Sequence, residues 1–271
     1  MRRAGYAPGV ARLLPAVVIA CAVAAAAVST APGAPTAVPG ATTAGAPRGW
    51  ASGVRAADRY AGSRSGLIAF AVRTQAGVRG RMLDQQFPSA SVVKAMLLVA
   101  YLRRHGDRPL TPRDRRLLTP MVRWSSNVAA TAVSNSLGSQ ALNALARRAR
   151  MPRFSEGERW GNSLITARDQ TRFFLRVDRL MPARHREYGM GLLARVVPEQ
   201  RWGVARAAPA GWNLFFKGGW GSGRGVVDHQ VALLTRGGER VSVAVLTLSN
   251  DHAAGKATLE GVSRRLLRGL G

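Results

Sequence analysis

The chain has 271 residues, 46% of them hydrophobic, which is enough for one large domain with a substantial core. Its 40 lysine and arginine residues against 14 acidic residues give a strongly basic formal charge of +26. The single cysteine, Cys21, lies near the start, which excludes disulfides and a cysteine protease in the rest of the chain. The arginines are scattered and follow no helix-turn-helix, zinc-finger or RNA-binding pattern, which argues against nucleic-acid binding.

The first 48 residues differ in composition from the remainder. Three arginines precede an apolar run over 13–28, and small residues follow, which is the order of a secretory signal. We predict a signal peptide over 1–29, an Ala/Pro/Gly-rich linker over 30–48, and a secreted or cell-envelope protein. The triplet before Cys21 also resembles a lipoprotein cleavage box, so lipid anchoring at Cys21 is an alternative. No later segment approaches about 20 apolar residues, so no membrane span is predicted in the mature chain.

Residues 49–271 are predicted to form one domain in which strands at both ends enclose a helical middle. A cap, a first-turn proline and an acid open a helix at Thr111, and Thr166 and Asp169 form a second capping box. Gly237-Gly238 marks a hairpin turn. The expected helices cover 50–60, 91–102, 112–123, 127–137, 139–150, 166–181 and 257–270, and the expected strands cover 67–72, 78–83, 213–217, 225–235 and 240–248. This order predicts an α+β fold, with an antiparallel sheet formed by both chain ends, flanking helices and an all-helical lobe.

Lys94 is the one charge inside the nearly all-apolar segment 91–102, which is typical of a helix buried on every side. Ser91 lies three residues earlier, so the two side chains share a helix face and the amine can reach the hydroxyl. A desolvated lysine has a depressed pKa and can accept the proton of a serine nucleophile. Only three of the 40 basic residues are lysine, and a lysine, unlike an arginine, can give up its proton.

Two further short elements follow in the chain. Ser125-Ser126-Asn127 lies 34 residues after Ser91, and Lys217-Gly218-Gly219 ends a predicted strand 92 residues after Ser125. With Ser91-Val92-Val93-Lys94, this order resembles the Ser-x-x-Lys, Ser-x-Asn and Lys-Thr-Gly elements of the class A β-lactamases and penicillin-binding proteins. The resemblance spans about residues 67–248 and includes the order of helices and strands.

The resemblance implies a role for each element. Ser91 would attack a carbonyl to form an acyl-enzyme, Lys94 would take part in accepting its proton, and Ser125 would pass a proton to the leaving nitrogen. The remaining implied roles are in substrate binding: orientation by Asn127, positive potential for a carboxylate from Lys217, and an oxyanion hole from the backbone N–H groups of Ser91 and of Trp220, which follows Gly219.

The sequence departs from the family pattern in the second and third elements. Ser126 stands where Asp is more usual, and Gly218 stands where a Thr or Ser hydroxyl helps to hold a carboxylate. Arg224 or Ser222 would compensate for the missing hydroxyl. The interval between the first two elements is short, which predicts a trimmed helical lobe.

The acid that would activate the hydrolytic water is the main open point. Class A enzymes carry Glu-x-x-Leu-Asn in a loop, and the nearest match here runs from Glu158 to Asn162, without the leucine. Glu158 is therefore the candidate for this role, and Glu156 is the alternative. Without such an acid the acyl-enzyme would persist.

Neither a metal nor a cofactor is predicted. The four histidines show no metal-binding spacing, and Asp228-His229 lacks the Gly-x-Ser-x-Gly elbow of a Ser-His-Asp hydrolase, so we interpret this pair as structural or surface.

The leading hypothesis is an exported serine hydrolase, monomeric, that acts like a β-lactamase on a β-lactam or a related cell-wall amide in the response to an antibiotic. The first alternative is a penicillin-binding or D-Ala-D-Ala peptidase-like protein. The second is a non-catalytic envelope module of the same fold that holds anionic polymers on its basic surface, and the third is a secreted nucleic-acid-binding protein.

Overall fold

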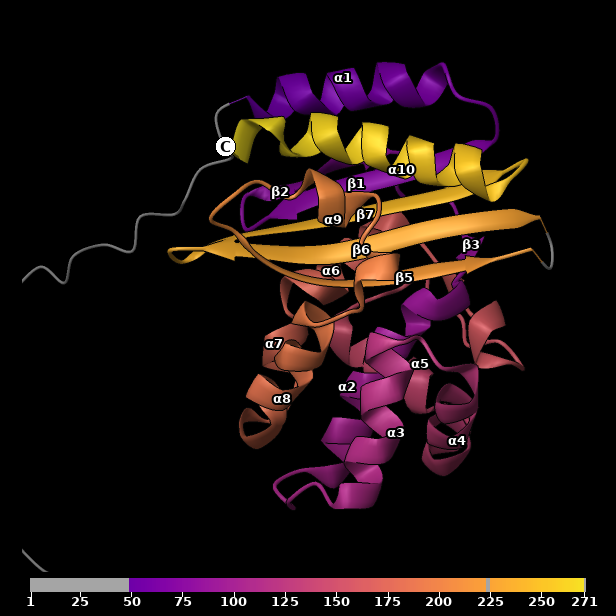
Figure 1. Ribbon diagram of the computed structural model, residues 1–271, viewed down its shortest axis with the longest axis vertical. Coiled ribbons are helices and arrows are strands. Elements are labelled where there is room, and N and C mark those ends of the chain that lie inside the picture. The colour runs from indigo at the N-terminus through magenta and orange to yellow at the C-terminus, as the bar shows by residue number, and fades with distance from the viewer. Residues whose placement is uncertain (1–48, 223–224, 271) are drawn as a thin grey trace, which may run out of the picture. The chain divides into compact units, whose positions relative to one another are not determined.

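The computed structural model describes residues 49–222 and 225–270, which form a five-stranded antiparallel sheet with helices on both faces (Figure 1). The strand order is β2-β1-β7-β6-β5. The strands are β1 (Leu67–Thr74), β2 (Gly77–Arg81), β5 (Asn213–Gly221), β6 (Val226–Arg236) and β7 (Glu239–Ser249). Both ends of the domain supply this sheet, so the predicted α+β fold is confirmed. The predicted signal peptide and linker, and Arg224, lie outside the described residues.

Both faces of the sheet are buried. Figure 1 shows α1 (Trp50–Gly62) and α10 (His252–Leu267) side by side on one face, with the helical lobe beneath the other. In β1, Ile68 and Phe70 belong to the core under α1 and α10, whereas Ala69 belongs to the core of the lobe. This double burial explains why the strands read as continuous apolar runs rather than as alternating patterns.

The helical lobe is built around α2 (Lys94–His105), whose residues 94–102 are all buried. The helices around it are α3 (Pro112–Arg123), α4 (Asn127–Leu137), α5 (Ala141–Ala149), α6 (Ala167–Leu175), α7 (Val177–Leu180) and α8 (Ala183–Ala194). The predicted capping box at Thr111 is present in full. At the start of α6, Thr166 Oγ1 accepts from the Asp169 N–H, but the Asp169 carboxylate accepts from the Arg153 N–H instead of completing the box.

Several predicted bounds were wrong. The segment 166–181 is two helices rather than one, α8 was not predicted, and α10 begins at His252 because the Asp251 side chain caps it by accepting from the Ala254 N–H at 2.7 Å. The short strands β3 (Phe87–Pro88) and β4 (Leu164–Ile165), which pair with each other, were also missed. The hairpin turn is confirmed, with positive φ at both Gly237 and Gly238.

Candidate active site

Ser91 lies in the 3₁₀ turn η1 (Ala90–Val93), between β3 and α2. The α-helix itself begins at Lys94, so the prediction that Ser91 starts it was wrong by one turn. Two backbone contacts fix the chain just before the turn: the Ser89 N–H donates to the Ser163 carbonyl at 2.7 Å, and His229 Nε2 contacts the Pro88 carbonyl at 2.9 Å. Burial lowers the pKa of His229 to about 4, so its ring is neutral and the Nε2–H donates. His229 is therefore structural, as expected.

Lys94 is fully buried and carries its amine into the space between the sheet and the lobe. Its Nζ contacts the Ser125 carbonyl, lies 3.2 Å from Ser125 Oγ and lies 2.7 Å from Asn127 Oδ1. Burial lowers the pKa of Lys94 to about 7, so part of the population is neutral at physiological pH. In the described part of the chain no hydrogen bond joins this amine to Ser91 Oγ, so the expected direct contact is replaced by contacts to the second element.

Lys217 approaches the same serine from the sheet side. It is fully buried on β5, and its Nζ donates to Ser125 Oγ at 3.1 Å and to the Gly218 carbonyl at 2.8 Å. Burial, followed by repulsion from Lys94, holds the pKa of Lys217 well below its usual value. The structure thus brings both lysines of the predicted motifs to one hydroxyl.

The loop between α3 and α4 presents Ser125 to these amines. Ser125 has a φ of 60°, and the Ser126 N–H donates to the Pro120 carbonyl at 3.0 Å, which fixes the turn. Ser126 Oγ accepts from the Ala129 N–H and caps α4. The serine that stands in place of the more usual Asp therefore acts as the helix cap.

The contacts around Lys94 allow a directed proton path. The Ser125 carbonyl and Asn127 Oδ1 can only accept, so they use two N–H groups of the amine. The Ser125 hydroxyl can donate to the lone pair of neutral Lys94 while it accepts from Lys217. Protons can therefore pass between Lys94 and the cleft through Ser125 Oγ.

Gly219 lets β5 approach the turn that carries Ser91. A Cβ at Gly219 would lie 2.7 Å from the backbone nitrogens of both Ser91 and Val92, a distance that no side chain tolerates. The next residue, Trp220, lines the same pocket as Ser91 with 39% of its surface exposed. The predicted oxyanion-hole residues Ser91 and Trp220 thus lie on facing elements.

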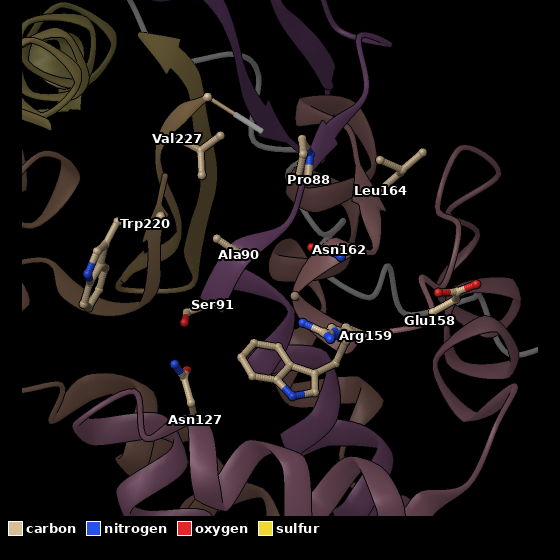
Figure 2. A pocket seen from close by; sticks show the side chains of 14 residues that line it. Pro88, Ala90, Ser91, Asn127, Glu158, Arg159, Asn162, Leu164, Trp220 and Val227 are labelled. Atoms are coloured by element: carbon tan, nitrogen blue, oxygen red, sulfur yellow. The ribbon is translucent and has the colours of Figure 1, made fainter. Parts of the chain in front are cut away.

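A cavity of about 760 Å³ opens at Ser91. Figure 2 shows the Ser91 hydroxyl and the Asn127 amide pointing toward each other, with Trp220 on one side and Pro88, Leu164 and Val227 beyond them. Polar Glu158, Arg159 and Asn162 line the cavity as well. Ser222 is exposed just after β5.

Glu158 lines the cavity at a distance from its reactive part. In Figure 2 its carboxylate is directed away from Ser91, beyond Arg159. The alternative, Glu156, accepts from the Asn143 N–H at 3.3 Å and is tied to α5. Neither carboxylate contacts Ser91 or Lys94 in the described residues, and the water-activating role of Glu158 stays a prediction.

Sequence reasoning missed Trp160, which takes the place next to the reactive lysine. Lys94 Nζ lies 4.8 Å from the centre of the Trp160 ring, and the indole N–H donates to Thr131 Oγ1 at 3.2 Å. Trp160 lies inside the segment 158–162, which was singled out for its acid and not for its indole.

No three His, Cys, Asp or Glu side chains within 49–222 and 225–270 gather as a metal site. In the same residues no helix is both long enough and apolar enough to cross a bilayer.

Comparisons with known proteins agree with this geometry. The family model for the beta-lactamase enzyme family matches residues 112–270. A crystal structure of a beta-lactamase from Desulfarculus baarsii is 21% identical, with a TM-score of 0.70, over 82% of this chain and 98% of that one. A class A beta-lactamase from Mycobacterium abscessus is 20% identical, with a TM-score of 0.66, over 81% and 99%. A structure of PBP-A is 16% identical, with a TM-score of 0.69, over 81% and 96%. No curated protein sequence matches the chain.

At these identities the solved structures establish the fold alone, whereas the family model covers more than half of the chain. The matched region contains two of the three elements, at Ser125 and Lys217, whose side chains are joined by a hydrogen bond. The protein therefore belongs to the beta-lactamase enzyme family.

Proposed function

We propose that the protein is an exported serine hydrolase whose Ser91 forms an acyl-enzyme with a β-lactam or a related cell-wall amide. The observation that carries this proposal is the buried Lys94 amine, whose pKa of about 7 lets it accept a proton near neutral pH. The hydrogen bonds that link Lys94 through Ser125 to Lys217, and the contact of Lys94 with Asn127, which lines the cavity together with Ser91, support an acyl-transfer site.

In the proposed acylation, Ser91 Oγ attacks the carbonyl carbon and its proton passes to neutral Lys94. The backbone N–H groups of Ser91 and Trp220 stabilise the resulting oxyanion. The C–N bond then breaks, and the proton returns from Lys94 through Ser125 Oγ to the leaving nitrogen. Water later cleaves the ester, which releases the acid and restores the Ser91 hydroxyl.

Lys217 is proposed to bind a substrate carboxylate. It has no carboxylate partner among the described residues, and burial lowers its pKa, which favours the neutral form. A bound anion would favour the ammonium form, so substrate binding would be accompanied by proton uptake. Asn127, whose Oδ1 already holds Lys94, would orient the substrate through its amide N–H.

A penicillin-binding or peptidase-like protein is the second candidate, and Trp160 favours it. The indole covers the Lys94 amine on the side of the loop that carries Glu158, whose own carboxylate is directed away. A water molecule at the acylated serine would then lack a nearby carboxylate base, and deacylation would be slow.

Export remains part of the proposal. The arginines, apolar run and small residues over 1–29 support a signal peptide, with 30–48 as linker and 49–271 as the mature domain. Mass spectrometry of the protein released by a bacterial host would test it, because an uncleaved N-terminus would contradict export and a lipid adduct would indicate anchoring at Cys21.

The decisive experiment combines nitrocefin turnover with intact-mass spectrometry after incubation with a labelled penicillin. We expect a covalent adduct on the unmodified protein and on Ser139→Ala, a control at an exposed serine, but not on Ser91→Ala. Rapid turnover would identify a β-lactamase, whereas a stoichiometric adduct that persists would identify a penicillin-binding protein. If none of the three proteins forms an adduct, the proposed enzymatic function is contradicted and a non-catalytic envelope module is favoured.

A further inference from the structure

A second cavity, of about 450 Å³, lies between the end of α5 and α6, away from Ser91. Three arginines line it: Arg147 and Arg150 near the end of α5, and Arg172 on α6. Buried Met151 and half-buried Phe154 line it as well. We call Arg147, Arg150 and Arg172 the arginine pocket.

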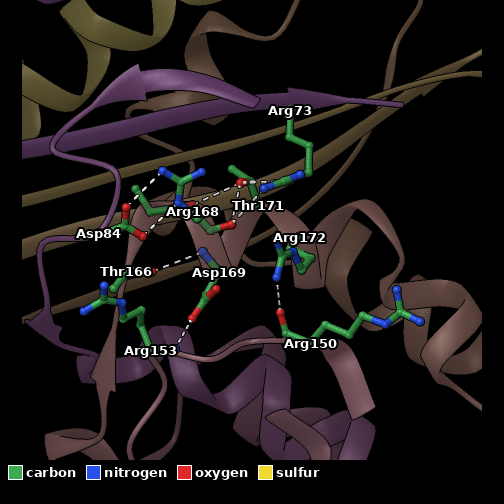
Figure 3. A network of polar contacts seen from close by, with 10 residues as sticks. Arg73, Asp84, Arg150, Arg153, Thr166, Arg168, Asp169, Thr171 and Arg172 are labelled. Carbon is green, nitrogen blue, oxygen red and sulfur yellow. Dashed lines mark hydrogen bonds and ion pairs between the residues drawn. The ribbon is translucent and has the colours of Figure 1, made fainter. Parts of the chain in front are cut away.

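The charges of the arginine pocket are not neutralised within the described residues. None of its three guanidinium groups forms an ion pair, and Arg147 and Arg150 are exposed. Arg172 donates to the Arg150 carbonyl, which positions one guanidinium inside the pocket and leaves its charge unpaired. In Figure 3 the Arg150 guanidinium extends away from the network and joins none of its hydrogen bonds.

Among the described residues, the neighbouring carboxylates form no ion pair with the arginine pocket. Asp84 receives both hydrogen bonds of a fork from Arg168, at 2.8 and 2.9 Å. Asp169 is buried next to this cluster, and burial raises its pKa. Its carboxylate accepts from the backbone N–H of Arg153, not from a guanidinium.

The half-buried Arg73 is affected by the charges of Arg172 and Arg168. Burial, followed by repulsion from Arg172 and Arg168, lowers the pKa of Arg73 to about 10. Glu156 is the other acid near the cavity, and it bonds to the backbone of Asn143 at the far end of α5. Positive charge therefore remains in excess around the cavity.

We propose that the arginine pocket binds a phosphate-bearing linear polyanion. Planar guanidinium groups match the oxygens of a phosphodiester, and unpaired arginines gain most from such a ligand. Figure 3 shows the guanidinium groups of Arg150, in the pocket, and of Arg153, outside it, on opposite sides of the network, so positive charge is presented on both sides. A chain with repeated charges can contact both ends of the cluster.

The pocket favours a polymer without bases over a nucleic acid. Binding of single strands relies on aromatic side chains on which bases stack. Of the residues that line the cavity, the one aromatic side chain is Phe154, and it is half-buried. This inference does not depend on the proposed acyl-enzyme.

Long-chain inorganic polyphosphate is a direct probe, with binding measured by fluorescence anisotropy over a series of salt concentrations. The pocket variant is Arg147→Ala/Arg150→Ala. The matched control is Arg55→Ala/Arg59→Ala on α1, which removes the same charge from two exposed arginines without ion pairs. Thermal unfolding verifies that both variants fold.

We expect the pocket variant to weaken polyphosphate binding about tenfold or more and to reduce the salt slope by about one for each arginine removed. The control should change the affinity by less than about threefold. Equal losses in both variants, or no binding by the unmodified protein, would overturn the proposal. Tighter binding of single-stranded DNA that the pocket variant also loses would identify a nucleic-acid site and overturn the polymer assignment.

Discussion

The cleft at Ser91 and the arginine pocket are both cationic, but they hold their charge in different ways. The cleft uses two lysines, Lys94 and Lys217, that are fully buried and share one serine hydroxyl. The pocket uses arginines, and Arg147 and Arg150 are exposed to solvent. Neither region places a carboxylate against these cations within the described residues.

This difference separates a group that can exchange a proton from groups that can only attract an anion. Burial brings the pKa of Lys94 to about 7, so its charge depends on pH and on what is bound. An exposed guanidinium stays protonated, so it can attract an anion but cannot take a proton. The protein has only three lysines among 40 basic residues, and two of them occupy the place where the charge must be conditional.

The largest effect is expected when Lys94 is replaced by an arginine, the residue type of the pocket. Lys94→Arg keeps the positive charge but removes the proton acceptor, so we expect the acylation rate to fall by about 10³-fold. The measurement is the second-order rate constant for labelling by a fluorescent penicillin.

Lys256→Arg is the matched control for this substitution. Lys256 is exposed on α10, with its amine 5.5 Å from the Trp202 ring, and an arginine can keep that contact. We expect an unchanged rate. Acylation by Lys94→Arg at the unmodified rate would show that Lys94 does not accept the Ser91 proton.

The next effect tests the second lysine. Lys217→Ala should slow acylation by a penicillin carboxylate about 100-fold, because loss of one partner of a buried charge pair costs about 2–5 kcal/mol. Acylation by the methyl ester of the same penicillin, which offers no anion, should change by less than about fivefold. Equal losses with acid and ester would assign Lys217 a structural role instead.

Much of the fold could be predicted because its signals are local. The capping box at Thr111, the turn at Gly237-Gly238 and the apolar run of β1 each specify their element within a few residues. The strands β3 and β4 are two residues long, too short for a periodic pattern, and their pairing joins Phe87 to Ile165, 78 positions later in the chain. Such contacts are set by tertiary packing and leave no local signal.

The candidate site divides in the same way. Ser91, Lys94, Ser125 and Lys217 could be singled out from the sequence because few residue types can perform the proposed chemistry and lysine is rare in this chain. The direction in which a side chain points could not be predicted from the sequence. Glu158 has the expected spacing but is directed outward, and Trp160, two residues later, faces the Lys94 amine.

A smaller effect is expected when the pH is changed, because the acylation rate depends on the protonation of Lys94. Below about pH 7 the amine is protonated, so the acylation rate should fall about tenfold for each pH unit and should level off above it.

The free energy of unfolding should also depend on the protonation of Lys94. The folded-state pKa lies below the unfolded value of 10.5, so the folded protein binds fewer protons and becomes more stable as the pH rises from about 7 toward 10.5. Urea unfolding of Lys94→Met should show a weaker rise.

The smallest effect is expected from the substitution of Glu158, measured as the deacylation rate. Because the Glu158 carboxylate is directed away from Ser91, Glu158→Gln should change the deacylation rate by less than about threefold, whereas loss of a working general base costs about 10²–10⁴-fold. Glu156→Gln is the control, since a glutamine oxygen can still accept from the Asn143 N–H. Deacylation is followed as loss of the penicillin mass from the protein. A hundredfold loss confined to Glu158→Gln would mean that the loop turns inward on acylation, and Trp160 would then have to leave the Lys94 amine to make room for the carboxylate.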